Sequence, residues 1–263
     1  MASPLARLVE GKGTPLVMLN GGLMSYGSWD PVLEKMRAGR RILRFDFRHQ
    51  LFSLSAPDVR PGLEGHAADL AELLDETGLG PAHFVATSFG AEVALELALG
   101  QPERFLSLAA ITAMDRETPE FRAGNDEMQE ILAAILAGGP RRPFWDALLQ
   151  SVYSESFQRK EAEFLESRGS KLDLLPAAYF LGVSRILRDL EGFDFSQRLE
   201  PFPFPSLVVI AAGDRVMPPE RSWALAGAIG AEVLVHQGSG HGLVAEDPAW
   251  VGEVCRDFLA RLA

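Results

Sequence analysis

Short apolar runs recur near both ends of the chain. Seven runs have the length of a β-strand and are continuously apolar rather than alternating: Leu5–Val9, Pro15–Leu19, Arg41–Phe45, His83–Thr87, Leu106–Ile111, Ser206–Ala211 and Glu232–His236. Continuous apolar runs of this length are typical of strands that are buried on both faces of a parallel sheet.

Segments with helical periodicity lie between these runs. They are found near Trp29–Met36, Leu63–Thr77, Phe89–Ala98, Glu220–Ile229 and Pro248–Leu262. The alternation of strand and helix predicts an α/β fold with a doubly wound, mostly parallel sheet of about seven or eight strands, flanked by helices.

The middle of the chain, residues 116–205, interrupts this alternation. It contains no convincing strand, only helical segments such as EMQEILAAILAG, PFWDALLQSVY, FQRKEAEFLE and PAAYFLGVSRILRDLEG. The stretch PFPFPS at Pro201–Ser206 predicts a stiff connector, because its three prolines disfavour both helix and central strand. We therefore expect a cap of about four helices at 116–205, inserted into a core formed by 1–115 and 206–263.

Phenylalanine is concentrated in this insertion. Nine of the sixteen phenylalanines of the chain fall within it: Phe121, Phe144, Phe157, Phe164, Phe180, Phe193, Phe195, Phe202 and Phe204. A thin helical layer needs large side chains to form a core, and some of these rings can also line an apolar substrate pocket. Phe144 and the adjacent Trp145 are the candidates for substrate contact within the insertion.

Composition narrows the class of protein. The chain has 263 residues, of which 47% are hydrophobic and 23% are charged, as is ordinary for a globular enzyme. A net charge of −11 argues against nucleic-acid binding, which needs clustered Lys and Arg. No apolar run is long enough to span a bilayer, and the first residues do not resemble a signal peptide. We expect a cytoplasmic monomer or homodimer that acts on a small molecule and has no membrane partner.

Cysteine and histidine spacing gives no indication of a metal or a cofactor. Cys255 is the single cysteine, which excludes a disulfide framework, and its helical surroundings predict a small apolar core residue. His83 and His236 lie inside predicted strands and His66 lies on a helix face, so all three are expected to be structural. No histidine spacing matches a known metal motif.

A serine stands where a predicted strand meets a predicted helix, in the stretch Ala86-Thr87-Ser88-Phe89-Gly90. A serine at this place often only caps the helix. Small residues two positions before and two after it, however, are what a sharp strand-to-helix turn needs if the side chain at its apex is to point outward. This pattern matches a nucleophile elbow with Ala86 in place of the first glycine.

An acid and a base follow in the order that such a nucleophile requires. Asp214 ends a buried strand, and twenty-seven residues later His241 lies in a loop between two glycines. Ser88, Asp214 and His241 are therefore the predicted catalytic residues. Asp115, after the strand Leu106–Ile111, is the competing acid.

The same chemistry needs backbone N–H groups that stabilise a developing oxyanion. Phe89 follows the serine directly and is one predicted donor. Gly22 is the other, because Asn20-Gly21-Gly22 follows an early strand directly. The alternative interpretation of this tripeptide is an ordinary turn.

The motifs NGGLM, FDFRHQLFS, ATSFG, GDRVMPP and GSGHG, in this order, resemble those of the α/β-hydrolase fold family along nearly the whole chain. The most similar branch is the capped one that holds small carboxylesterases and enol-lactone hydrolases. The resemblance implies an eight-stranded sheet with a helical lid. Because only fourteen residues precede Pro15, we expect a truncated first hairpin and about seven strands.

Three departures from the family pattern accompany this resemblance. Asn20 replaces the usual histidine, Ala86 replaces the first elbow glycine, and the loop that starts at Asp46 has lost both of its usual glycines. In relatives that loop borders the site, so His49 and Phe52 are candidate substrate contacts. Leu23 and Val216, next to the predicted oxyanion loop and acid, are the other two candidates.

These observations favour a serine hydrolase that cleaves a small, largely apolar carboxylic ester or lactone through an acyl-enzyme. Acyl transfer or perhydrolysis with the same three residues is an alternative, because exclusion of water decides between these outcomes. A hydrolase-like binding protein without activity is a third hypothesis, since fold does not determine function.

Overall fold

The computed structural model describes residues 4–56 and 60–262, and it contains one seven-stranded sheet with the strand order β1-β3-β2-β4-β5-β6-β7. The strands are β1 (Arg7–Gly11), β2 (Thr14–Leu19), β3 (Arg40–Phe45), β4 (Ala82–Thr87), β5 (Phe105–Ile111), β6 (Ser206–Ala211) and β7 (Glu232–His236). Each lies within two residues of a predicted strand, which confirms the fold class.

All pairings in the sheet are parallel except that of β1, which runs antiparallel to β3 at one edge. The central strands β4 and β6 are buried along their whole length, whereas the edge strands β1 and β7 are half-exposed. The predicted burial on both faces therefore holds for the centre of the sheet. It does not hold at the edges, where one side of the strand has no neighbour.

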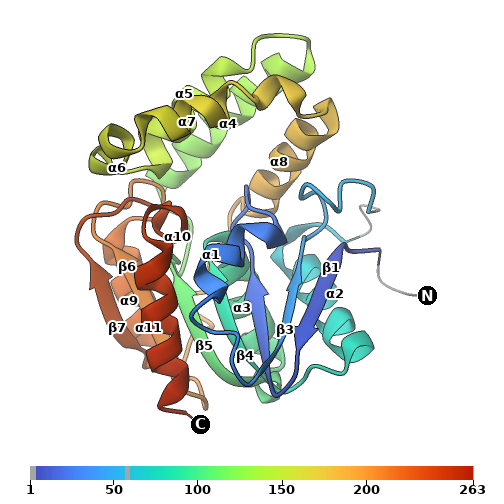
Figure 1. The fold of residues 1–263 in the computed structure, drawn as a ribbon, viewed down its shortest axis with the longest axis vertical. Coiled ribbons are helices and arrows are strands. Elements are labelled where there is room, and N and C mark those ends of the chain that lie inside the picture. Colours follow the sequence, from blue (N-terminus) through green and yellow to red (C-terminus); the bar gives the residue numbers. More distant parts are fainter. Residues whose placement is uncertain (1–3, 57–59, 263) are drawn as a thin grey trace.

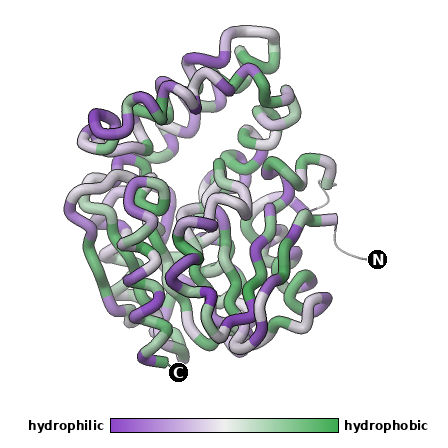
Figure 2. The backbone as a smooth tube through the Cα atoms, in the orientation of Figure 1, coloured by the Kyte–Doolittle hydropathy of each residue, from purple (hydrophilic) through white to green (hydrophobic). Residues whose placement is uncertain are grey.

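Helices cover both faces of the sheet (Figure 1). One face packs against α1 (Asp30–Leu33), α10 (Leu243–Glu246) and α11 (Pro248–Ala260). The other packs against α2 (Gly62–Thr77), α3 (Phe89–Gly100) and α9 (Pro219–Ile229). Hydrophobic residues, green in Figure 2, are concentrated along the strands in the interior of the core. Cys255 is buried in the first of these two cores, as predicted.

The helix predicted near Trp29–Met36 is shorter than expected. A 3₁₀ turn, η1 (Tyr26–Trp29), leads into the single turn of α1, and the chain then passes through turns to Gly39. Gly39 has a φ of +69°, a conformation that L side chains rarely adopt and that does not continue a helix. A second short 3₁₀ turn, η2 (Pro102–Arg104), precedes β5.

Residues 119–189 form a layer of helices above the carboxyl ends of the strands (Figure 1). The layer contains α4 (Pro119–Leu136), α5 (Arg142–Val152), α6 (Glu155–Lys160), α7 (Ala162–Gly169), the 3₁₀ turn η3 (Leu172–Leu174) and α8 (Ala177–Asp189). Five α-helices stand where about four were predicted, because the segment FQRKEAEFLE breaks at Glu161, whose φ and ψ of −111° and 28° are not helical. The boundaries of a separate cap domain at 116 and 205 stay a prediction.

Most of the phenylalanines in the insertion are core residues. Phe121, Phe193, Phe195 and Phe204 belong to the core between the sheet and α2, α3 and α9. Phe144 and Phe180 belong instead to a small core inside the helical layer. Phe164 is exposed. The buried phenylalanines of the insertion are therefore explained by their role in forming a hydrophobic core.

The described part of the chain contains no helix that is both long and apolar enough to cross a membrane.

Helix α3 approaches the end of β2 so closely that only glycine is tolerated at Gly90. A Cβ atom added there would lie 2.6 Å from the carbonyl oxygen of Asn20 and 2.7 Å from that of Leu19. Both neighbours are backbone atoms, which cannot rotate away as a side chain can. The predicted need for a small residue at this position thus has a steric cause.

We expect Gly90→Ala to destabilise the protein by about 1–3 kcal/mol, because the new methyl group forces α3 away from β2. Gly124→Ala is the matched control: Gly124 lies inside α4 with no atom within 4 Å of an added Cβ. That variant should gain about 0.5–1 kcal/mol. Urea unfolding measures both changes, and equal effects of the two substitutions would contradict the steric argument.

Candidate active site

Ser88 lies at the apex of the turn between β4 and α3. Its φ and ψ of 50° and −130° are unusual for a residue with a side chain. The turn is held by a hydrogen bond from the Ser88 N–H to the carbonyl oxygen of Ile111, at 3.0 Å. Ser88 does not cap α3 with its side chain. The hydroxyl is consequently free to point away from the helix that follows it.

His241 joins the serine to a carboxylate. Its Nε2 lies 2.9 Å from Ser88 Oγ, and its Nδ1 lies 2.8 Å from Asp214 Oδ2. The other oxygen, Asp214 Oδ1, accepts hydrogen bonds from the backbone N–H groups of Val216 and Met217, at 2.9 and 2.8 Å. The carboxylate is thus fixed on one side and directed at the imidazole on the other.

Asp115, the competing acid, lies elsewhere. Its carboxylate forms a two-contact ion pair with the guanidinium of Arg221, with Nε 2.8 Å from Oδ1 and Nη2 in contact with Oδ2. The acid that His241 contacts is Asp214.

The predicted oxyanion loop lies against the serine turn. A Cβ added to Gly21 would be 3.6 Å from Ser88 Cβ, and one added to Gly22 would be 3.8 Å from Phe89 Cβ. Phe89 is the first residue of α3, so helix geometry leaves its N–H without an acceptor inside the helix. Both predicted donors therefore belong to backbone segments that border Ser88.

A buried amide network holds this loop in place. Asn20 Nδ2 lies 2.8 Å from the carbonyl oxygen of Phe45 and 3.0 Å from Gln50 Oε1, while Asn20 Oδ1 accepts from Trp29 Nε1 at 2.9 Å. Gln50 Nε2 in turn donates to the carbonyl oxygen of Gly21 at 2.8 Å. Because a trans peptide is planar with its C=O and N–H on opposite sides, fixing the Gly21 carbonyl also fixes the direction of the next N–H, that of Gly22.

Asp46 extends the network into the loop after β3. Its carboxylate accepts from the N–H of Tyr26 at 2.6 Å, from that of Phe52 at 2.9 Å and from Asn20 Nδ2 at 3.2 Å. Burial raises the pKa of Asp46, and these hydrogen bonds oppose the shift. Asn20, which stands where the family pattern usually has a histidine, therefore has hydrogen-bond partners at both Nδ2 and Oδ1.

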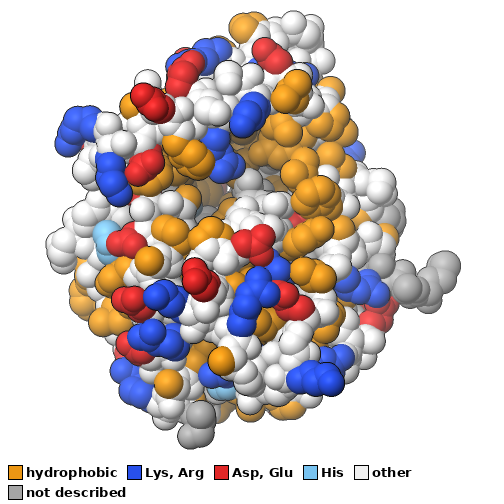
Figure 3. Space-filling view, viewed as in Figure 1, with side chains coloured by type: hydrophobic (Ala, Val, Ile, Leu, Met, Phe, Trp, Pro, Cys, Tyr) orange, Lys and Arg blue, Asp and Glu red, His pale blue; other side chains and the backbone are white. Residues whose placement is uncertain are grey.

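The helical layer touches both halves of this site. From α8, Ile186 lies against the predicted oxyanion loop at Gly22, where an added Cβ would lie 3.1 Å from its side chain. From the end of α5, the carbonyl oxygen of Val152 accepts the N–H of Gly242, next to His241, at 2.8 Å. The space-filling view shows a hollow between this layer and the core, with hydrophobic side chains along one wall (Figure 3).

The six predicted substrate contacts are in different environments. Leu23 and Phe52 are exposed by 37% and 56%, and the Phe52 ring packs on Tyr26 with centroids 5.2 Å apart. Val216 is half-buried next to Asp214. His49 is buried, and Gly182 of α8 lies against its carbonyl group.

Phe144 and Trp145 are buried inside the helical layer, Phe144 against Phe180 and Trp145 against Gly169 of α7. The structure therefore brings Leu23 and Val216 next to the loops around Ser88, whereas it places Phe144 and Trp145 within the layer's own core.

Sequence reasoning missed Gln50 and Glu92. The signal for Gln50 was weak, because it lies at a variable position between the two replaced glycines of the loop that starts at Asp46. Glu92 gave a weaker signal: a carboxylate in the most apolar stretch of α3.

Glu92 is completely buried one turn after Ser88. Its Oε1 accepts the N–H of Met114 at 3.0 Å, and Oε2 has no hydrogen-bond partner among the described residues. Burial raises the pKa of Glu92 well above the usual 4.5, and the nearby Asp214 carboxylate adds to the shift. Burial of Glu92 therefore favours its neutral form in the folded protein.

We expect Glu92→Gln to stabilise the protein more at pH 8 than at pH 5. The folded state keeps the Glu92 proton while the unfolded state releases it above its ordinary pKa, so wild-type stability falls as pH rises toward the folded pKa. Glutamine has no such proton and avoids this loss. Urea unfolding at both pH values measures the difference. A gain that is the same at pH 5 and pH 8 would show that the carboxyl is not held neutral.

Comparison with known proteins agrees with this architecture. The profile of the alpha/beta hydrolase fold family matches residues 14–248. A protein from Azorhizobium caulinodans, called a putative carbamate hydrolase RutD, is 28% identical over 222 residues, which are 83% of this chain and 80% of that protein.

Solved structures are similar over almost the whole chain. An α/β hydrolase, MGS-M2, from a deep-sea metagenome library has a TM-score of 0.90 at 22% identity, covering 97% of this chain and 94% of its own. A thermophilic esterase from Thermogutta terrifontis gives 0.82 at 23%, covering 98% and 93%. The enol-lactonase from Burkholderia xenovorans LB400 gives 0.80 at 18%, covering 97% and 96%. At these identities the similarity establishes the fold.

Proposed function

The chain belongs to the α/β-hydrolase fold family, and from this premise we propose that it is a serine hydrolase of small, largely apolar carboxylic esters or lactones. The observation that carries the proposal is the unbroken chain of contacts from Ser88 Oγ through His241 to Asp214. A serine hydroxyl is a weak nucleophile alone and becomes reactive when an oriented base accepts its proton.

The reaction follows from the directions of these groups. Ser88 Oγ attacks the carbonyl carbon while His241 Nε2 takes the hydroxyl proton, and Asp214 stabilises the imidazolium that forms. The N–H groups of Phe89 and Gly22 stabilise the negative oxygen of the tetrahedral intermediate. His241 then gives its proton to the leaving alkoxide, and water repeats the sequence on the acyl-enzyme.

The surroundings of the serine favour a neutral, apolar substrate. Ile186 lies against the oxyanion loop, and Val152 and Tyr153 lie against Gly242 beside the imidazole. An anionic substrate would lose hydration at such an apolar wall.

Hydrolysis of a carbamate is the second candidate. It is favoured by the similarity to the Azorhizobium caulinodans protein named as a carbamate hydrolase, RutD. The same nucleophile, base and oxyanion donors would act on a carbamate carbonyl, so the two candidates differ in the substrate and share the mechanism.

Labelling with a fluorophosphonate tests the nucleophile. We expect wild type to be labelled and Ser88→Ala to remain unlabelled. Asp214→Asn should lower kcat by about 10⁴-fold, because the imidazole loses the group that sets its tautomer. Asp115→Asn is the matched control and should keep most of its kcat, since Asp115 contacts Arg221. Absence of labelling in well-folded wild type would overturn the proposal.

A substrate panel then separates the candidates. Aryl acetate, butyrate and octanoate, several lactones and N-alkyl aryl carbamates are compared by kcat/KM, each with and without added alcohol. Esters or lactones should exceed carbamates of equal size. The reverse order would assign the carbamate activity, and an alcohol-dependent ester product would assign acyl transfer.

We expect Gln50→Leu to lower kcat by about 10²-fold with little change in KM, because the Gly22 N–H loses its fixed direction. Inhibition by a trifluoromethyl ketone, which forms a tetrahedral oxyanion, should weaken in parallel. Gln129→Leu is the control, since Gln129 Nε2 also donates to a backbone carbonyl, that of Ser184, but within the helical layer. Loss of stability with unchanged kcat and inhibitor affinity would limit Gln50 to a structural role.

A further inference from the structure

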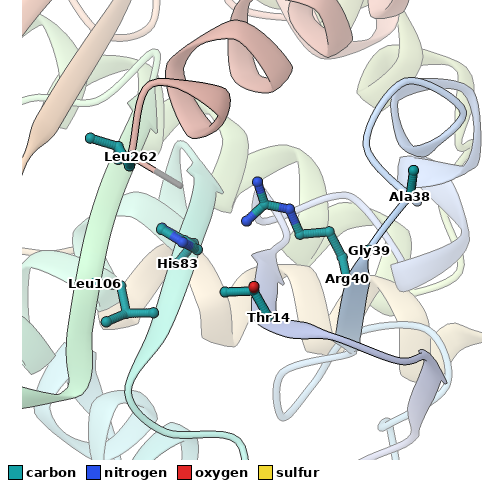
Figure 4. A pocket seen from close by; sticks show the side chains of 7 residues that line it. All are labelled: Thr14, Ala38, Gly39, Arg40, His83, Leu106 and Leu262. Atoms are coloured by element: carbon teal, nitrogen blue, oxygen red, sulfur yellow. The ribbon is translucent and has the colours of Figure 1, made fainter.

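We propose that a second pocket, at the opposite end of the sheet from Ser88, binds a small carboxylate anion through Arg40 and His83. The pocket has a volume of about 410 Å³ and is lined by Thr14, Ala38, Gly39, Arg40, His83, Leu106 and Leu262 (Figure 4). Small-molecule sites typically have volumes of roughly 300–1,000 Å³.

The position of the pocket separates it from the proposed hydrolase site. Thr14, Arg40, His83 and Leu106 lie at the amino ends of β2, β3, β4 and β5, whereas Ser88 follows the carboxyl end of β4. His83 and Ser88 are five positions apart along the extended strand, which corresponds to about 16 Å. The inference therefore does not depend on the proposed function.

Arg40 is the reason that we propose an anion as the ligand of this pocket. Its neighbours are all engaged: Arg37 and Arg44 with Glu10, and Arg41 with the carbonyl oxygen of Thr77. The Arg40 guanidinium, by contrast, has no hydrogen-bond or ion-pair partner among residues 4–56 and 60–262. Figure 4 shows its side chain extending across the pocket toward His83.

Leaving this cation half-buried, with no partner in the described part of the chain, costs free energy. Burial lowers the pKa of Arg40, which is the direction expected when a charge loses water and gains no partner. A bound carboxylate would reverse this cost. The planar fork of a guanidinium matches the two oxygens of a carboxylate.

His83 supplies a second polar group from the neighbouring strand. It is 5% exposed, and its Nδ1 lies 2.7 Å from Ser107 Oγ. Burial and the positive charge of Arg40 lower the pKa of His83 to about 4, so the ring is neutral at pH 7. When Ser107 donates to Nδ1, the tautomer carries its proton on Nε2, where it can donate to an anion.

The walls of the pocket indicate what accompanies the carboxylate. Leu106, Leu262 and Ala38 contribute apolar groups, and Thr14 contributes a hydroxyl. Such walls favour a short aliphatic chain attached to the anion over a fully hydrated ion such as phosphate. The net charge of −11 repels anions in general, so binding here requires the local cation.

Butyrate is the probe, and the imidazole proton resonances of His83, assigned with a His83→Gln variant, are the readout at pH 7. We expect saturable shifts with a Kd of about 1 mM in wild type, corresponding to about −4 kcal/mol. The isosteric neutral amide butyramide should cause no saturable shift, and phosphate at equal ionic strength should bind more weakly than butyrate.

Arg40→Gln should weaken butyrate binding by about tenfold or more. Arg37→Gln removes the same charge from the same region but not from the pocket, because Arg37 pairs with Glu10, and it should bind butyrate as wild type does. Urea unfolding verifies that both variants are folded.

Three results would overturn the proposal: no saturable shift up to 50 mM butyrate, equal binding of butyramide, or equal weakening by the two arginine substitutions. Tighter binding of phosphate than of butyrate would refute the assignment to an aliphatic carboxylate. The comparison of butyrate with butyramide in wild type needs no variant and tests the anion site even if Arg40→Gln fails to fold.

Discussion

The direct contact between the backbone of α3 and the end of β2 is the constraint on which the proposed active site depends. At Gly90 these two segments approach to a distance that excludes even a methyl group. One side of the contact continues backward to Ser88, and the other continues forward to Gly21 and Gly22. A single steric requirement therefore sets the separation between the serine and the loop that would stabilise its oxyanion.

Hydrogen bonds then fix the orientation of the peptide groups, which packing alone does not determine. Packing brings the loop near the serine, but the direction of each peptide depends on where its carbonyl group bonds. Gln50 and Asn20 provide that direction, and Asp46 connects Asn20 to the backbone N–H groups of Tyr26 and Phe52 in the two loops around it. All three side chains are buried, so each lost hydrogen bond would leave an unsatisfied group away from water.

Local patterns in the sequence were sufficient to predict the strands and the order of Ser88, Asp214 and His241, since apolar runs and glycine-rich turns are short-range signals. Interactions across the fold were not predictable in this way. The break at Glu161 and the burial of His49 under α8 depend on contacts between distant segments. Phe144 is in the core of the helical layer for the same reason: a periodic apolar residue shows that a face is buried, but not against what.

The attachment of the helical layer at two separate places has a mechanical consequence. The layer meets the predicted oxyanion loop through Ile186 of α8, and it meets the loop of His241 through the carbonyl group of Val152. These two loops follow β2 and β7, which are separated in the sheet by three strands. A rigid tilt of the helical layer about either attachment would therefore displace one loop relative to the other. The same movement that opens or closes the hollow would then also change the distance between Gly22 and His241.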